Sequence, residues 1–202
     1  MIPLPTPRTD WSTSALALLL LLLASGHASA QAPEPPGPWV LDVRGATSGL
    51  PSDTAFFPEI SIDTLVPSRG FGFDVGAHVY LFSVGPSRVG VGASYLSARG
   101  TTDTVTAHVT SLAPQVSFNF GSRTGWSYLS AGAGTASVRT TAVQLTGTAE
   151  QETGAVLTMN FGGGARWFLT SHLGVGFDIR WHRLSSTPTT MLFSAAAGFS
   201  VH

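Results

Sequence analysis

The segment from Leu157 to Trp181 limits the possible folds most strongly, because residue types alternate along both of its halves. In each half, every second residue is mostly apolar. The residues between them include polar side chains, Asn160 and Arg166 in the first half and Asp178 and Arg180 in the second. A period of two residues indicates a β-strand rather than a helix. The segment therefore predicts two strands joined by a tight turn at Thr170-Ser171. The apolar side chains that share a parity are Leu157, Met159, Phe161, Ala165 and Trp167, and then Leu173, Val175, Phe177, Ile179 and Trp181.

The N-terminus carries an export signal. Residues 15–24, ALALLLLLLA, form an apolar run that is too short to cross a bilayer as a helix. Arg8 precedes this run, and Ala28-Ser29-Ala30 follows it with the small-x-small pattern of a signal-peptidase site. We expect residues 1–30 to be a removed signal peptide, with an uncleaved N-terminal anchor as the alternative. Residues 31–38, QAPEPPGP, are expected to form a Pro-rich periplasmic linker.

Composition excludes several classes of function. The chain has no Cys, which rules out disulfides, thiolate catalysis and cysteine-type zinc sites. The formal net charge is −1, and nothing resembles a basic surface for nucleic acid. The His residues are scattered along the sequence, so we expect no metal site and no cofactor.

Eight strand-like segments follow residue 38. Pro114 removes a hydrogen-bond donor from the fourth segment and predicts a bulge there. The fifth segment is rich in Ala and Gly, so its facing is ambiguous. The segments are 39–47, 70–82, 88–98, 109–120, 125–138, the two halves of the opening hairpin, and 190–201.

The connections alternate in length. Gly85-Pro86, Ser122-Arg123 and Thr170-Ser171 are tight turns, whereas residues 48–69, 100–108 and 139–153 are longer, and residues 185–188 form the shortest member of that second set. Short periplasmic turns and longer external loops are typical of outer-membrane barrels. We therefore predict an all-β fold for residues 39–202, an eight-stranded antiparallel up-and-down transmembrane β-barrel. It is expected in the bacterial outer membrane with both termini in the periplasm. On composition alone, a secreted soluble sandwich is the alternative.

The aromatic residues sort toward the two ends of these strands. If the first strand runs outward, one group falls near the periplasmic end and another near the external end. Two aromatic belts of this kind are expected where a barrel wall meets lipid headgroups. The predicted membrane-interface aromatics are Trp39, Trp126, Trp167, Trp181, Phe193 and Phe199.

These patterns resemble the outer-membrane protein A-like family of small eight-stranded barrels. The similarity is greatest in the hairpin NFGGGARWFLTSHLGVGFDIR and in FGFDVGAHVY at the second strand. The resemblance implies a monomer that contacts outer-membrane lipid and lipopolysaccharide, and that meets periplasmic chaperones and the barrel-assembly machinery during biogenesis. Family chains usually end in an aromatic residue, whereas this chain ends in Phe199-Ser200-Val201-His202.

Polar residues that face inward form the candidate site. An eight-stranded barrel has room inside only for side chains, so charged groups there must pair. We expect an ion-pair network that fixes the register and fills the lumen, and a gated narrow pore is the alternative. The members come from the first, second and seventh strands: Asp42, Arg44, Asp74, His78, Asp178, Arg180 and His182.

These observations predict a structural or surface-interaction role. A narrow porin-like channel for small solutes is the alternative, and a lipid A-modifying enzyme is a third hypothesis. The sequence places Ser185 three residues after His182 and has no acidic residue after Asp178, which does not fit the lipid A deacylases. We therefore expect no catalytic residue. The apolar residues within positions 48–69 indicate either a partner surface or a loop that covers the barrel mouth.

Overall fold

The computed structural model describes residues 37–52, 66–144 and 147–202. The expected signal peptide and all but the end of the expected linker lie outside these residues, as does the centre of the connection at 48–69. Within the described part of the chain, no helix is long and apolar enough to cross a membrane.

The described residues form nine strands, which account for most of their length. Two of them, β5 and β6, form a hairpin that continues past the point where β7 begins to pair with β5. The strands are β1 (Trp39–Gly49), β2 (Arg69–Val84), β3 (Ser87–Thr101), β4 (Val105–Ser122), β5 (Gly125–Gln144), β6 (Gly147–Glu152), β7 (Val156–Phe168), β8 (Leu173–Leu184) and β9 (Thr190–Val201).

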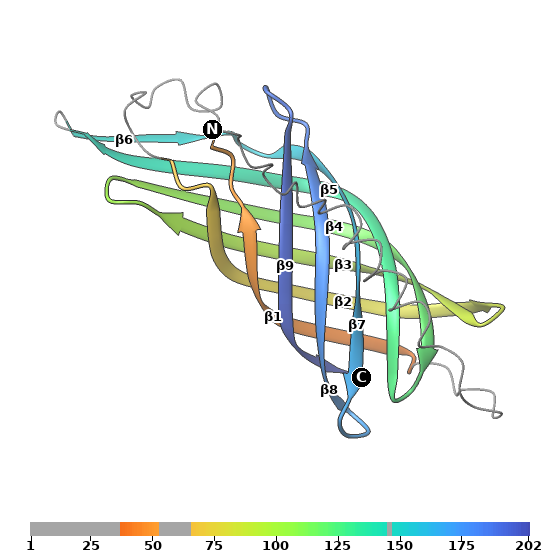
Figure 1. Ribbon diagram of the computed structural model, residues 1–202. Coiled ribbons are helices and arrows are strands. Elements are labelled where there is room, and N and C mark those ends of the chain that lie inside the picture. The colour runs from red at the N-terminus through yellow and green to blue at the C-terminus, as the bar shows by residue number, and fades with distance from the viewer. Residues whose placement is uncertain (1–36, 53–65, 145–146) are drawn as a thin grey trace, which may run out of the picture. The chain divides into compact units, whose positions relative to one another are not determined.

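Eight of the strands close into a ring (Figure 1). Each pairs antiparallel with its neighbours in chain order, β6 is skipped because β5 pairs directly with β7, and β1 pairs with β9. This confirms the predicted eight-stranded antiparallel barrel. We call the end where β1 begins and β9 finishes the terminal end, and the opposite end the loop end.

The side chains inside the ring differ in polarity from one end to the other, and the inward residues of β1 show this difference along the strand. Its inward residues are Val40, Asp42, Arg44, Ala46 and Ser48, and these and Leu50, directly after the strand, are all buried. The alternate residues Trp39, Leu41 and Val43 are 40–52% exposed on the outer face. Alternation therefore makes a wall with an apolar outside and a polar middle layer inside, as in a membrane barrel.

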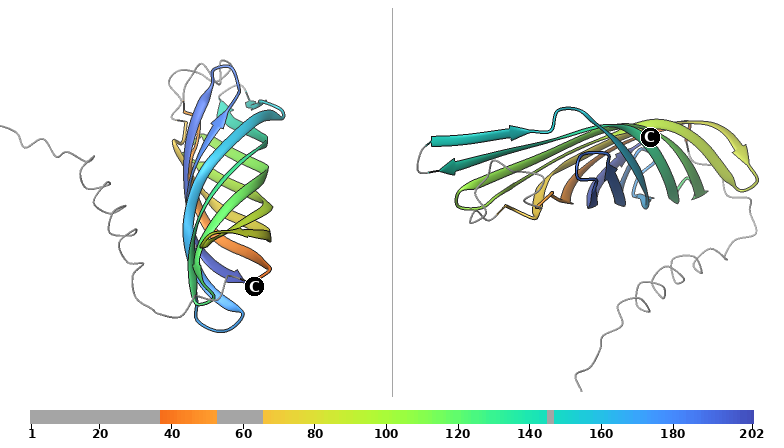
Figure 2. Two further views of the ribbon diagram at one scale, coloured as in Figure 1. Left: turned by 90° about the vertical axis from the view of Figure 1, so that its right-hand side faces the viewer. Right: turned by 90° about the horizontal axis from the view of Figure 1, so that it is seen from above.

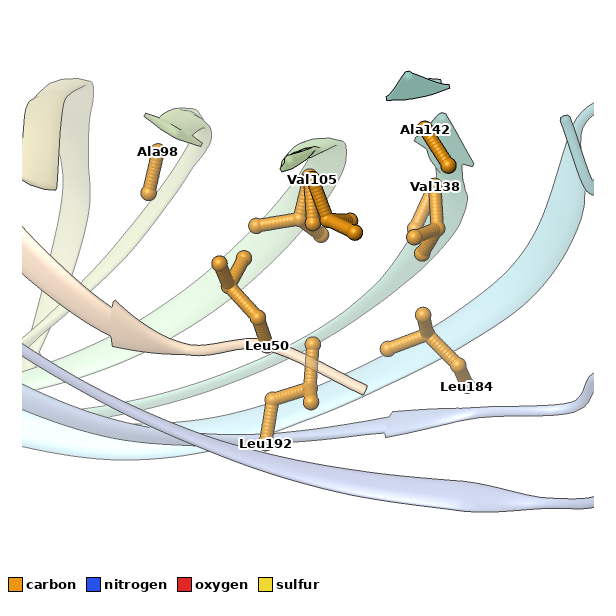
Figure 3. Close-up of a cluster of buried hydrophobic side chains, with 10 residues drawn as sticks. Leu50, Ala98, Val105, Val138, Ala142, Leu184 and Leu192 are labelled. Carbon is orange, nitrogen blue, oxygen red and sulfur yellow. The ribbon is translucent and has the colours of Figure 1, made fainter. Parts of the chain in front are cut away.

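At the loop end of β3, β4 and β5, the outward residues become polar and the inward residues become apolar. On β4, Phe118, Val116 and Leu112 face outward, but nearer the loop end the outward residues are Thr110 and His108. The inward residues change in the opposite sense, so a cluster of apolar side chains gathers inside the barrel at the loop end (Figure 3), with the buried hydroxyls of Thr140 and Thr158 beside it. Apolar residues inside and polar residues outside are what water on the outer face requires. The cluster comprises Leu50, Ala98, Val105, Ala107, Val109, Ala136, Val138, Ala142, Leu184 and Leu192.

Two of the expected long connections are mostly strand. Residues 100–108 were expected to form a loop, but only 102–104 separate β3 from β4. Residues 139–153 contain the end of β5 and all of β6, which lie side by side beyond the ring (Figure 2). The expectation of loops was wrong because the outward residues there are polar, so these segments lack the apolar outer face by which a membrane strand is recognised in a sequence.

Pro114 does not cause the predicted bulge. The pairing of β4 with β5 is interrupted at Ala113 and Pro114, yet it resumes in the same register at Gln115. The missing N–H of Pro114 therefore costs ladder bonds without inserting a residue. The register shift lies on β2 instead, between Tyr80 and Phe82.

Candidate functional site

The structure places all seven expected lumen residues inside the barrel. Their exposed fractions lie between 1% and 6%, although not all of them take part in ion pairs. They are Asp42, Arg44, Asp74, His78, Asp178, Arg180 and His182.

Asp42 on β1 is the centre of the first group of charges. Arg166 on β7 binds it through two hydrogen bonds, from Nε to Oδ1 at 2.8 Å and from Nη2 to Oδ2 at 2.6 Å. Ser200 donates a third hydrogen bond at 2.6 Å. Arg44 lies 2.8 Å from the same carboxylate and donates to Asp74 on β2 at 2.9 Å. The paired arrangement of Arg166 and Asp42 is the strong, geometrically specific form of an arginine–carboxylate contact.

Asp178 on β8 is the centre of the second group. Tyr128 on β5 donates to its Oδ2 at 2.7 Å, and Arg180 donates to its two oxygens at 3.2 and 2.9 Å. Arg180 also donates to Asn160 on β7 and to Ser130 on β5, both at 2.9 Å. These bonds extend across the interior from β8 to β5, so they connect strands that do not pair directly.

Arg166 completes the charge balance. Among the residues that the structure describes, the interior holds three buried Asp and three buried Arg: Asp42, Asp74 and Asp178 with Arg44, Arg166 and Arg180. We call these six residues the charge network. The sequence analysis put Arg166 on the polar parity of its strand but left it out of the candidate site, which would leave one carboxylate in excess. An unmatched buried carboxylate is costly, so this charge count was the available signal.

Tyr128 was also missed, because the facing of its Ala/Gly-rich strand was ambiguous. Its ring lies under the guanidinium of Arg166, at 3.9 Å from Cζ to the ring centroid. The distance fits a cation–π contact, which is stronger where water is excluded. Tyr128 therefore contacts both groups of charges, through its ring to Arg166 and through its hydroxyl to Asp178.

The two histidines in the interior stand apart from the ion pairs. His182 shares a 3.1 Å hydrogen bond with Ser194, and its Nδ1 has no partner among the described residues. Neither ring nitrogen of His78 has a hydrogen-bond partner there. The expectation that both histidines belong to the charge network is therefore not supported by their contacts.

Inward glycines make the room that these large side chains need. A Cβ on Gly92 would lie 2.7 Å from Cδ2 of His78, and one on Gly90 would lie 2.9 Å from Cδ1 of Tyr80. A Cβ on Gly164 would lie 2.8 Å from the Tyr128 hydroxyl oxygen, and at Gly92 and Gly164 it would also clash with the backbone carbonyl of the neighbouring strand. Bulky residues on one strand thus face bare backbone on another, which is how a tight barrel is filled.

Trp126 corrects one of the sequence predictions. It was expected in the outer aromatic belt, but only 2% of it is exposed and it packs inside the terminal end with Val40, Tyr80 and Phe168. Its ring stacks on Phe168 with a centroid distance of 4.6 Å. The residues that follow it are small on both faces of the strand, so the sequence does not show which way Trp126 points.

The C-terminal residue closes this aromatic cluster. The ring of His202 meets Phe168 edge-on at 4.1 Å and Trp126 at 5.6 Å between centroids. Partial burial, together with the nearby His172 and Arg123, lowers the pKa of His202. A neutral imidazole therefore packs among these aromatic rings.

The other expected belt residues lie on the outer face. Their exposed fractions are 44–59%, and Trp181 meets Phe193 edge-on at 5.4 Å between centroids. They are Trp39, Trp167, Trp181, Phe193 and Phe199.

Comparison with known proteins agrees with this architecture. A family model described as the outer membrane protein beta-barrel domain matches residues 16–200. No curated protein sequence matches the chain. The attachment invasion locus protein Ail of Yersinia pestis has a similar structure, with a TM-score of 0.55 and 12% identity over 82% of this chain and 98% of Ail.

Two further solved structures share the fold. Neisserial surface protein A superposes with a TM-score of 0.52 and 13% identity over 82% of this chain and 97% of that one. A structure of Ail with the heparin analogue sucrose octasulfate gives a TM-score of 0.52 and 11% identity over 81% and 96% of the two chains. Identities this low establish the fold and leave the activity open.

Proposed function

The chain belongs to the family of the outer membrane protein beta-barrel domain, and on that premise we propose a barrel closed by its own side chains, with a structural or surface-interaction role. Its partners in this role are outer-membrane lipid and lipopolysaccharide, and its termini lie in the periplasm. Periplasmic chaperones and the barrel-assembly machinery deliver it to the membrane as a monomer.

One observation carries the proposal, namely three successive layers of buried side chains along the interior. Val40, Tyr80 and Trp126 fill the terminal end, the charge network fills the middle, and the cluster around Val105 and Leu184 fills the loop end. An ion passing through would have to break buried Asp–Arg pairs and cross a layer rich in apolar side chains at either end. Both steps are costly for a charge.

A surface role is supported by what related folds do. Ail is named for attachment and invasion, and one of its structures holds a sulfated sugar analogue. In this chain the reversed alternation on β3, β4 and β5 gives the loop end a polar outer face, which suits contact with water-soluble or headgroup partners.

Enzymatic function receives less support, although two Ser–His contacts join residues of different strands, besides the contact between the adjacent turn residues Ser171 and His172. Ser194 and His182 meet in the interior at 3.1 Å, and Ser97 and His108 meet on the outer face at 2.9 Å. Among the described residues, no carboxylate contacts either imidazole, so each pair lacks the acid that orients a catalytic histidine. We infer a structural use of both pairs.

Conductance in planar bilayers tests the closed interior. The purified barrel should give no steady channels. Steady channels in the wild type whose conductance changes in Arg180→Ala would support the narrow pore instead.

Fractionation tests the compartment. The protein should appear in outer-membrane fractions as a band whose gel mobility differs between unheated and boiled samples. A soluble periplasmic product without that difference would contradict the proposal.

A further inference from the structure

Two grooves on the outer face meet at Phe71 on β2. The first is polar, measures about 520 Å³, and is lined by Ser97, Arg99 and His108 among others. The second is largely apolar, measures about 590 Å³, and runs over β1, β8 and β9. Phe71 and Gly72 line both grooves, so the two are adjacent on the protein surface.

The apolar groove exists because small residues face outward at adjacent register positions. Gly45 pairs with Ala197, and Thr47 pairs with Ala195, which also pairs with Ile179. Large residues stand at its margins, Phe71 on one side and Phe177 on the other. The groove lies in the apolar part of the outer wall, so its occupant must be a hydrocarbon chain.

The polar groove lies where the outer wall changes from apolar to polar. Arg99 is in register with Phe71 on one side and with His108 on the other, and His108 is in register with Arg139. On the same strand as Arg99, the outward residues change from Tyr95 to Ser97 within one step. This row therefore lies at the height of lipid headgroups.

The charges in the polar groove differ in their availability. Arg139 lies 3.3 Å from a Glu150 oxygen and 2.8 Å from a Glu152 oxygen, so its charge is already matched. Arg99 makes no ion pair with any residue that the structure describes, and it is exposed. An exposed guanidinium that has no ion pair among the described residues is suited to a phosphate, which it can bind through two parallel hydrogen bonds.

We propose that the two grooves together bind one phosphorylated membrane lipid. Arg99 binds a phosphate of the headgroup, Phe71 separates headgroup from tail, and one acyl chain lies in the groove over Gly45 and Ala197. The inference rests on the proposed placement of the barrel in the outer membrane, and a phosphorylated glycolipid of the outer leaflet is the occupant that this chemistry fits. A soluble protein partner is disfavoured because half of the site faces hydrocarbon.

Binding is measured by native mass spectrometry of the purified barrel in detergent micelles. The probes are lipid A with both phosphates, lipid A with the phosphates removed, and inorganic phosphate. The wild type should retain one phosphorylated lipid A and should bind the dephosphorylated form about tenfold more weakly, since charge-assisted hydrogen bonds are lost. Equal retention of the two lipids, or saturable binding of phosphate alone at this site, would overturn the proposal.

Variants locate the site. Arg99→Gln should lower the affinity for phosphorylated lipid A about tenfold without changing that for the dephosphorylated form. Ala197→Leu should weaken both, because it fills the acyl groove. Arg123→Gln, at a turn of the terminal end, should change neither. Identical binding by Arg99→Gln and Arg123→Gln would also overturn the proposal.

The same gel assay separates this inference from the proposed function. Each variant that keeps the difference in mobility between unheated and boiled samples is a folded barrel, so a loss of lipid binding then reports on the site itself. A folded barrel without selective lipid binding refutes the lipid site and leaves the proposed function standing. Absence of a folded, membrane-inserted wild type would instead refute the proposed function.

Discussion

The pairing of Asp42 with Arg166 should show strong energetic coupling. Asp42→Asn leaves three buried Arg facing two Asp, and Arg166→Met leaves three Asp facing two Arg. Each single change breaks a buried pair with bonds of 2.6 and 2.8 Å, so each should cost about 3–5 kcal/mol of folding free energy. Arg166→Met also removes the guanidinium from the Tyr128 ring.

The double variant restores the balance at two Asp and two Arg. Its cost should therefore fall short of the sum of the single costs by at least about 2 kcal/mol, roughly thirty-fold in the folding constant. The measurement is urea unfolding in lipid vesicles, followed by tryptophan fluorescence and by gel mobility, for the wild type, both single variants and the double variant.

A matched control is available on the same protein. Arg139 and Glu152 form an Arg–carboxylate pair of 2.8 Å on the exposed β5–β6 hairpin. The same cycle there should give no resolvable coupling, because water screens both charges. Additive costs at Asp42 and Arg166, within about 0.5 kcal/mol, would refute the idea that charge balance holds the interior together.

Three further outcomes are expected. Gly164→Ala should destabilise the barrel by about 1–3 kcal/mol in the same unfolding assay, because its Cβ would clash with the backbone carbonyl of Phe177 and with the Tyr128 hydroxyl, whereas Gly45→Ala on the outer face should be neutral. Thr148→Cys on β6 should react with an impermeant maleimide added to intact cells, and Thr124→Cys at the terminal end should not; the opposite result would invert the topology. Acidification protonates His202, whose folded-state pKa is lowered, so stability should fall as the pH drops through that pKa. His202→Phe should remove this pH dependence, and an unchanged pH profile would show that another group titrates.

The sequence predicted the wall of the barrel better than its ends. Two-residue alternation identified the inward faces of β1, β2 and β8 correctly, because lipid outside and charges inside differ strongly in residue type. The same signal failed on β5, where small residues occupy both faces, and this is why Trp126 was placed outside and Tyr128 was missed.

The two-residue alternation could not predict which side chains meet across the interior. Alternation gives the direction of a side chain but not the strand that it meets on the far side of the ring. Arg166 reaches Asp42 from a position 124 residues away, and only the closed ring brings them together. Likewise, the extended strands at the loop end were missed because their polar outer faces resemble loops.

The position of Asp42 has a consequence for the order of assembly. It lies on the first strand, but its hydrogen-bond donors Arg166 and Ser200 come from β7 and β9. Before β1 meets β9, this carboxylate has neither donor and only Arg44 of its own strand beside it, and desolvating it then would be costly. Water must therefore stay in the nascent interior until the last strand arrives. Ring closure and the final drying of the interior are then one cooperative event, which disfavours insertion of the strands one hairpin at a time.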